Sequence, residues 1–116
     1  MPIRPQPAPA FDSAAAWDRI SATYQRRNQI SINEVEYGPW SPPESALQLL
    51  GDVRGLQVLD LGCGGGQACI ALAKQGAQAI GLDISDEQIA FARALAAKEQ
   101  VAVNFNCGSA TDLSAF

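Results

Sequence analysis

Short apolar runs alternate with longer mixed stretches over the second half of the chain. Val58, Leu59 and Leu61 form a continuous apolar segment, typical of a strand buried on both faces of a parallel sheet. Two further runs, Gln78–Asp83 and Val101–Asn106, predict a second and a third strand. Strands that alternate with helices pair in parallel through crossovers, so the pattern predicts an α/β fold with a doubly wound parallel sheet.

Two helices are predicted between these strands. The first covers residues 67–75, with Gly76 as its stop. The second is capped by Ser85 and extends to about Glu99. Acidic residues in the first turn of this second helix suit the helix dipole.

The N-terminal part of the chain has a different pattern. Residues 1–10 contain four prolines, which predicts a disordered Pro/Ala-rich tail. Asp12 or Ser13 can cap a helix that ends near Arg27, and we treat residues 11–40 as a helix with a lid-like segment.

Three aromatic or apolar side chains share one face of this helix: Trp17, Ile20 and Tyr24. The simplest interpretation is that the face packs on the domain. The functional alternative is a lid over a bound cofactor or substrate.

A fourth helix is predicted just before the first strand. Gly38 and Pro39 mark a turn, and the neighbouring aromatic residues either anchor this loop or stack on a ligand. The sequence Ser41-Pro42-Pro43-Glu44 then has the form of a capping box with proline at the first helical position. We expect the helix that it opens to end at Gly51.

Glycines follow the first strand in the spacing Asp60-x-Gly62-x-Gly64-x-Gly66, directly before a predicted helix. Glycine permits positive φ and close approach of a ligand to the backbone, and a helix start offers free N–H groups to an anion. A dinucleotide site would need a third glycine where Gln67 stands. A turn without a ligand is the remaining interpretation.

Composition limits the class of protein. The chain has 116 residues, of which 47% are hydrophobic and 17% charged, which is typical of one small globular domain. With a net charge of −4 and no histidine, it lacks the basic surface expected for nucleic acid or an anionic membrane. We expect a cytoplasmic protein whose three cysteines are reduced, buried thiols rather than metal ligands.

The segment from Gln57 to Leu113 resembles the small-molecule class I S-adenosylmethionine (SAM) methyltransferases. The resemblance rests on the string Val-Leu-Asp-Leu-Gly-Cys-Gly-Gly-Gly, on Gly81-Leu82-Asp83-Ile84-Ser85, and on a Gly-Ser-Ala turn after the third strand. It implies that residues 41–116 form a SAM-binding, Rossmann-like half-domain, the three-strand N-terminal half of a seven-stranded fold.

The resemblance also implies a set of cofactor contacts. The glycine turn would hold the methionine end of SAM, Asp83 the ribose, and Ile84 the adenine. The family usually has an aspartate at the position of Ser109, so either Ser109 or Asp112 would contact the adenine. The expected SAM-binding residues are Asp60, Gly62, Cys63, Gly64, Gly66, Asp83, Ile84, Ser109 and Ala110.

The charge of Asp60 distinguishes a SAM site from a dinucleotide site. A carboxylate at Asp60 would repel a pyrophosphate but complement the ammonium and sulfonium groups of SAM. We therefore expect a SAM-dependent methyltransferase acting on a small-molecule acceptor. The alternatives are half of an NAD(P)-dependent oxidoreductase and a non-catalytic SAM-binding fragment.

No residue of this chain is predicted to be catalytic or to bind a metal. Transfer of an activated methyl group mainly requires positioning of the acceptor, and we expect the acceptor half of the fold to lie outside these residues. The first strand would then have an unpaired edge through which copies could associate.

Overall fold

The computed structural model of the chain describes residues 2–5 and 10–116, so half of the tail predicted over residues 1–10 lies outside the described residues. In chain order, the described residues form α1 (Ser13–Arg27), α2 (Glu44–Leu47), β1 (Gln57–Leu61), α3 (Gln67–Lys74), β2 (Gln78–Asp83), α4 (Asp86–Glu99) and β3 (Asn104–Cys107).

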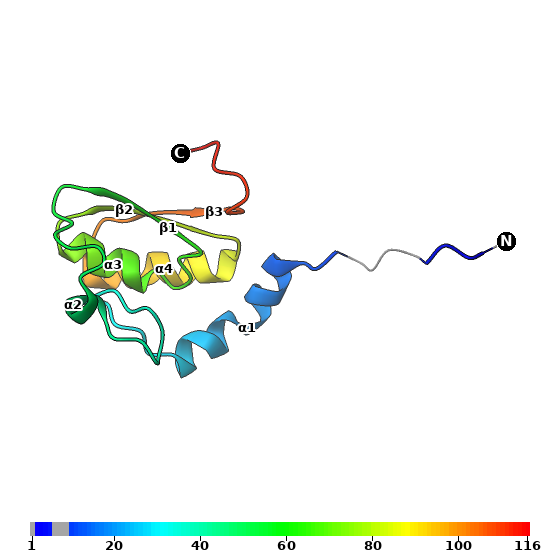
Figure 1. Cartoon of the computed structure of the whole chain (residues 1–116), viewed down its shortest axis with the longest axis horizontal. Coiled ribbons are helices and arrows are strands. Elements are labelled where there is room, and N and C mark those ends of the chain that lie inside the picture. Colours follow the sequence, from blue (N-terminus) through cyan, green and yellow to red (C-terminus); the bar gives the residue numbers. More distant parts are fainter. Residues whose placement is uncertain (1, 6–9) are drawn as a thin grey trace.

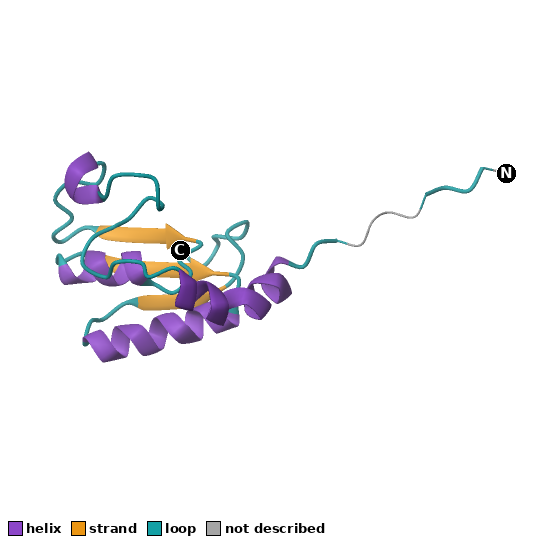
Figure 2. Cartoon of the chain, turned by 90° about the horizontal axis from the view of Figure 1, so that it is seen from below, coloured by secondary structure: helices purple, strands orange, loops and turns teal. Residues whose placement is uncertain are grey.

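The three strands form one parallel sheet in the order β1-β2-β3. Helices α3 and α4 link consecutive strands and lie against the same face of the sheet (Figure 1). Figure 2 shows the same layers from the helix side, with α1 beside α4. This is the Rossmann-like α/β arrangement that the sequence predicts, and β1 is an edge strand among the described residues.

The core lies between the sheet and its two covering helices. Ile70 and Cys69 of α3 and Ile89 of α4 are almost fully buried, and Phe105 of β3 packs against the same cluster. Burial of each large apolar side chain contributes about 1.5–3 kcal/mol to folding. This layer therefore fixes the position of both helices relative to the ends of the strands.

Strand β1 is not buried on both faces, contrary to the prediction. Leu59 and Leu61 remain 38% and 46% exposed because no helix covers the face on which they lie. Part of that face is approached only by the C-terminal residues: Ala115 and Phe116 line a shallow cavity that Leu59 also lines. The continuous apolar run thus belongs to a strand that helices cover on one face only.

Strand β3 begins at Asn104 rather than at the predicted Val101. Gln100 adopts a left-handed conformation with φ of 57°, and the Val101 N–H donates to the carbonyl of Ala96. This backbone bond closes the C-terminus of α4. The Val101 N–H is therefore not free to join the sheet.

Helix α1 has the predicted bounds, and the Asp12 side chain accepts the N–H of Ala15 as its cap. Its buried residues, however, are Ser21 and Gln25. The apolar stripe remains partly open, with Trp17 39% and Ile20 48% exposed. The stripe thus packs on the domain only in part, through Trp17 and Tyr24, which line cavities together with residues of the sheet and the glycine turn.

Helix α2 is a single turn, and the predicted capping box is wrong. Its N-cap is Pro43, whose side chain has no hydrogen-bond acceptor, and the helix ends at Leu47 because Gln48 adopts a left-handed conformation with φ of 53°. The Glu44 carboxylate instead accepts the N–H groups of Leu49, Leu50 and Gly51 at 2.7–3.2 Å. These bonds fold the chain back before it enters β1.

The glycines after β1 differ in their surroundings. Gly62, Gly64 and Gly66 have φ of 75°, 55° and 77°. A Cβ added at Gly66 would lie 2.5 Å from the Phe105 ring and 2.8 Å from Ala92, whereas one at Gly62 or Gly64 would meet nothing within 4 Å. Gly66 is therefore required for packing, and the first two glycines border open space.

Substitution of Gly66 should be far more damaging than substitution of Gly64. Gly66→Ala adds a steric conflict to a left-handed backbone and should lower the free energy of unfolding by about 2–4 kcal/mol. Gly64→Ala, the matched control, should cost only the backbone strain of about 1–2 kcal/mol. Urea denaturation of both variants measures the difference, and equal losses would contradict the assignment of Gly66 to packing.

Stability should also depend on the charge of Glu44. Burial would raise the pKa of this carboxyl, but the backbone N–H groups and the Tyr37 hydroxyl outweigh it and hold the pKa below the ordinary 4.5. A lowered pKa stabilises the fold above the unfolded pKa, and that contribution is lost as the pH falls through the folded pKa.

We therefore expect Glu44→Gln to lower the melting temperature at pH 7, with the difference from the parent shrinking below about pH 4.5. Thermal melts from pH 3 to 8 test this. A difference that is independent of pH would mean that the charge of Glu44 is unimportant.

Candidate functional site

The glycine turn (residues 62–66) is bonded to the end of β2. The N–H groups of Gly62 and Cys63 both donate to the carbonyl of Leu82, at 2.7 and 2.9 Å. The turn closes on itself through the Gly66 N–H and the Cys63 carbonyl, 3.0 Å apart. The carboxyl ends of β1 and β2 are thereby joined, which is where α/β sheets bind ligands.

Asp83, the last residue of β2, points toward this turn. One carboxylate oxygen accepts the N–H of Gly64 at 2.8 Å and the other accepts that of Ser85 at 3.0 Å. A carboxylate has about four lone-pair sites, so each oxygen can accept one more donor. Asp83 can therefore shape the turn and bind ligand hydroxyl groups at the same time.

A cavity of about 370 Å³ lies beside this carboxylate, and we call it the Asp83 cavity. Its walls come from the ends of β2 and β3 and from α1. The predicted site residues that line it are Gly62, Asp83, Ile84, Ser109 and Ala110. Three segments that are distant in the sequence thus line one cavity.

A second cavity, of about 420 Å³, lies on the other side of the turn, and we call it the Asp60 cavity. Asp60, Gly62 and Cys63 line it together with mostly apolar side chains from α1, α3 and the segment before α2. Burial raises the pKa of the Asp60 carboxyl, the thiol of Cys69 lowers it, and the negative charge of Asp83 raises it further.

Gly62 lines both cavities, so the two cavities are neighbours at this residue. Gly64 and Gly66 line neither cavity. The Gly64 N–H is taken by Asp83, and Gly66 is buried beneath the turn. A cofactor contact for these two glycines stays a prediction.

Helix α1 contributes to the site in a way that sequence analysis did not identify. The side-chain amide of Gln25 donates to Gln88 at 2.9 Å and accepts from Gln67 at 2.6 Å, and all three side chains are buried. Gln25 also packs against Gly65, where an added Cβ would lie 2.5 Å from its nitrogen. The sequence signal was weak, because isolated glutamines are common on exposed helix faces.

The loop after β3 separates the two candidates for the adenine contact. Ser109 lines the Asp83 cavity, and its hydroxyl bonds that of Thr111 at 2.7 Å. Asp112 is exposed and does not line this cavity, and its pKa is lowered by hydrogen bonds from Ser114. Ser109 is therefore the better placed of the two.

The cysteines differ from the prediction in one respect. Cys63 and Cys69 are buried free thiols, as expected, but Cys107 is exposed. Partial burial, followed by the neighbouring carboxyl of Asp86, raises the pKa of Cys107 to about 11. The thiol is thus protonated at neutral pH and is a poor nucleophile.

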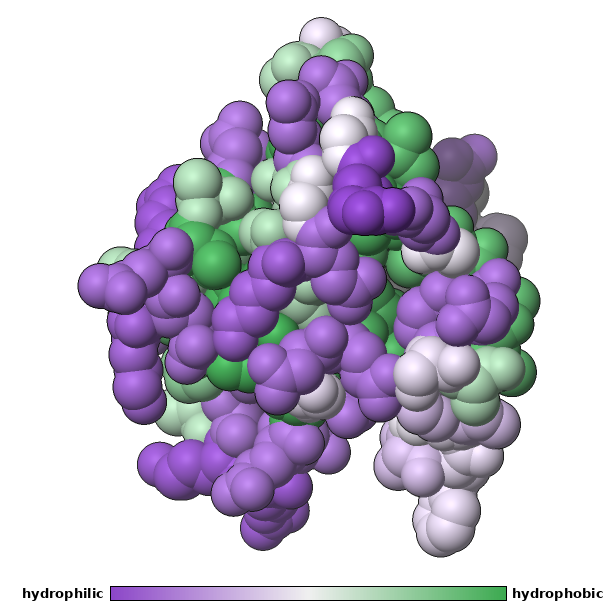
Figure 3. Space-filling model, turned by 90° about the vertical axis from the view of Figure 1, so that its left-hand side faces the viewer, coloured by the Kyte–Doolittle hydropathy of each residue, from purple (hydrophilic) through white to green (hydrophobic). Residues whose placement is uncertain are grey.

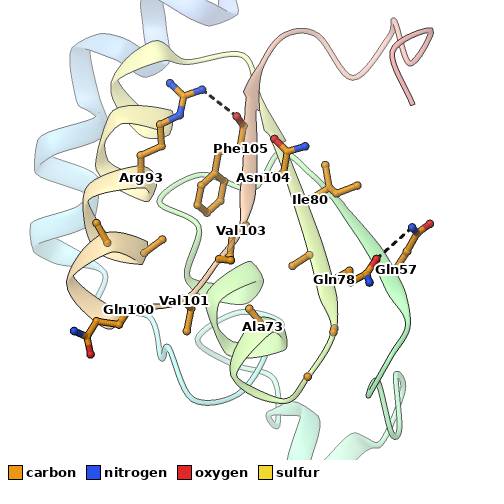
Figure 4. Close-up of a pocket in the computed structure, with 16 residues that line it drawn as sticks. Gln57, Ala73, Gln78, Ile80, Arg93, Gln100, Val101, Val103, Asn104 and Phe105 are labelled. Atoms are coloured by element: carbon orange, nitrogen blue, oxygen red, sulfur yellow. Dashed lines mark hydrogen bonds between the residues drawn. The ribbon is translucent and has the colours of Figure 1, made fainter.

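A further cavity, of about 1060 Å³, lies away from the glycine turn. The first residues of all three strands line it, so it is at the amino ends of the sheet (Figure 4). Polar side chains cover most of this end of the molecule (Figure 3). Its only charged lining residue, Arg93, donates to the carbonyl of Phe105. This groove therefore offers no comparable set of functional groups.

Within residues 2–5 and 10–116, no group of three or more His, Cys, Asp or Glu side chains is arranged to hold a metal ion. None of the helices described there is long and apolar enough to cross a membrane.

Known proteins resemble this chain over most of its length. It is 32% identical to a ubiquinone biosynthesis O-methyltransferase of Xylella fastidiosa, covering 88% of this chain and 47% of that protein. It is 47% identical to the protein of the same name from Shewanella halifaxensis, covering 89% of this chain and 41% of that one. The chain thus spans less than half the length of these relatives.

The fold also matches a solved structure. Magnesium protoporphyrin IX methyltransferase of Synechocystis, determined with bound SAH, aligns with a TM-score of 0.64 at 24% identity, covering 86% of this chain and 51% of that one. At this identity the likeness concerns the fold alone. Residues 58–116, half of the chain, match the family described as methyltransferase domain. The chain therefore belongs to the methyltransferase domain family, as the sequence motifs predict.

Proposed function

We propose that this chain is the SAM-binding part of a methyltransferase that transfers a methyl group to an oxygen atom of a small molecule. The observation that carries the proposal is that the Asp83 and Asp60 cavities share Gly62 as a common wall. SAM is an elongated ligand with adenosine at one end and an amino acid at the other, so its two ends suit two neighbouring cavities that share a lining residue.

The residues present fit the two ends of SAM. In the Asp83 cavity, Asp83 retains free lone pairs for the ribose hydroxyls, and Ile84 offers an apolar surface for the adenine. In the Asp60 cavity, the Asp60 carboxylate would attract the ammonium group. The space above Gly62 is free of protein atoms, so the ligand can approach the backbone closely.

SAM supplies an activated methyl group on a positively charged sulfur. The residues of this chain would hold the cofactor and exclude water from one side of it. No side chain is assigned as a general base, because Asp60 and Asp83 are both used in binding. The family relatives named O-methyltransferases support oxygen as the acceptor atom.

The alternatives make different demands on the site. An NAD(P) site would place a pyrophosphate at the glycine turn, close to the carboxylates of Asp60 and Asp83, and the resulting repulsion disfavours it. A non-catalytic SAM-binding fragment would satisfy the same cavities. It is distinguished by the absence of methyl transfer in the complete protein.

Two expectations from the sequence remain proposals. The edge of β1 that faces away from β2 could pair with a further strand or with a second copy of the chain. The cytoplasmic location is likewise a prediction that a localisation experiment would test.

SAM binding should depend on the charge of Asp83. Asp83→Asn retains an acceptor oxygen but replaces the other with an amide, and we expect a loss of affinity of about 10- to 100-fold. Isothermal titration calorimetry with SAM, S-adenosylhomocysteine and NAD measures the effect. Asp112→Asn, an exposed aspartate outside both cavities, is the matched control.

The parent chain should bind SAM and show no comparable affinity for NAD. Unchanged SAM affinity in Asp83→Asn would exclude the ribose contact. Tighter binding of NAD than of SAM would favour the oxidoreductase alternative.

Substitution of Asp60 should have opposite effects on stability and on binding. Because burial raises the pKa of Asp60, its charged form costs stability in the free protein above the folded pKa, and this cost disappears when the pH falls below both the folded and the unfolded pKa. Asp60→Asn should therefore raise the melting temperature at pH 7 and weaken SAM binding.

The pH dependence provides a second test. In the parent, SAM affinity should fall as the pH drops through the raised pKa of Asp60, because the neutral acid no longer attracts the ammonium group. In Asp60→Asn this component should be absent. A variant that loses stability and binds SAM normally would contradict the assigned role.

A further inference from the structure

Helix α1 has a polar stripe that is buried and an apolar stripe that is partly exposed, which is the reverse of the usual arrangement. Its polar residues Ser21 and Gln25 are buried, whereas Trp17 and Ile20 of the apolar stripe are 39% and 48% exposed. Apolar side chains normally supply the buried face of a surface helix. Packing alone therefore does not account for the position of the aromatic residues.

The polar stripe fixes α1 to the loops that form the site. Gln25 bonds Gln67, the residue that follows the glycine turn. Asp18 accepts the hydroxyl of Ser85 and the N–H of Glu87, both just after Asp83. These bonds hold the exposed stripe of α1 in a defined position relative to the two cavities.

Each cavity is lined by one ring of this stripe. Trp17 lines the Asp83 cavity and Tyr24 lines the Asp60 cavity, and Gly62 belongs to both. The ring centroids are 5.7 Å apart and the planes are nearly perpendicular, at 85°. Because the two rings pack against each other, the pair links the lining of one cavity to the lining of the other.

Given the proposed SAM site, we infer that the Trp17–Tyr24 pair contacts the sulfonium group of SAM and favours SAM over its neutral product, S-adenosylhomocysteine. The sulfur of SAM lies between the adenosine and the amino-acid tail. It would therefore lie between the two cavities when the two ends of SAM occupy them. The face of an aromatic ring attracts a cation, by an amount that corresponds to about 2- to 30-fold in affinity.

The two ligands make a clean comparison. Both carry adenosine, an ammonium group and a carboxylate, so the contributions of Asp60 and Asp83 to the two affinities are similar. They differ in the methyl group and in the charge on sulfur. The ratio of the two affinities therefore reports what surrounds the sulfur.

The test is calorimetric titration of the full chain with SAM and with S-adenosylhomocysteine. Trp17→Leu and Tyr24→Leu should each weaken SAM binding by about tenfold and change S-adenosylhomocysteine binding by no more than about twofold. Trp17→Phe and Tyr24→Phe retain a ring and should preserve the ratio. Ile20→Leu, on the same stripe but lining neither cavity, is the matched control.

A second measurement covers variants that fail to fold. The chain has two tryptophans, and Trp40 is 98% exposed, so Trp40→Phe leaves Trp17 as the only tryptophan, whose emission can be excited selectively over that of tyrosine. SAM should then change the Trp17 emission. A larger change with SAM than with S-adenosylhomocysteine is the expected result.

Each failure has a distinct meaning. Equal losses for both ligands in the leucine variants, or a Trp17 emission that SAM does not alter, would overturn the inference while leaving the SAM site intact. A parent chain that binds neither ligand would overturn the proposed function, and the inference with it.

Discussion

The Asp83 carboxylate is the constraint on which the rest of the site depends. By accepting the N–H groups of Gly64 and Ser85, it ties the glycine turn after β1 to the start of α4. The turn has no large side chains of its own to hold its shape. The half-buried carboxylate of Asp83 therefore holds the turn that borders both cavities. Its oxygens can still accept hydrogen bonds from ligand hydroxyl groups.

The glycine turn combines two requirements that the sequence does not separate. Gly62 faces open space, while Gly66 is enclosed by Phe105 and Ala92. The spacing of the motif predicts both as ligand contacts, because a glycine required for close packing and one required for ligand approach look alike in sequence. Their different surroundings depend on β3 and α4, which lie far along the chain.

Local signals predicted the elements that depend on local chemistry. Gln78–Asp83 and the helix capped by Ser85 have the expected bounds, because the alternation of apolar runs and the side-chain cap act within a few residues. The predicted helix up to Gly51 failed because the Glu44 carboxylate binds the backbone beyond a single turn of helix. Such a bond competes with a helix in a way that propensity does not reveal.

The candidate site was predictable where it lies on strand ends, and it was missed where α1 contributes. Strand ends follow directly from the apolar pattern, so Asp60, Asp83 and Ser109 could be placed at one edge of the sheet. The position of α1 depends instead on buried hydrogen bonds of Gln25 with Gln67 and Gln88. Because this buried face of the helix is polar, the amphipathic pattern predicted that the opposite, apolar face would be the buried one.

Electrostatics in the free protein also limits the ligands that this site can accept. Asp60 is partly buried, and the charge of Asp83 adds to the cost of ionising it. An anionic pyrophosphate would increase this repulsion, whereas a ligand with ammonium and sulfonium groups would relieve it. The two carboxylates therefore favour a cationic ligand before any shape is considered, and the aromatic residues of α1 extend that preference because ring faces also attract positive charge.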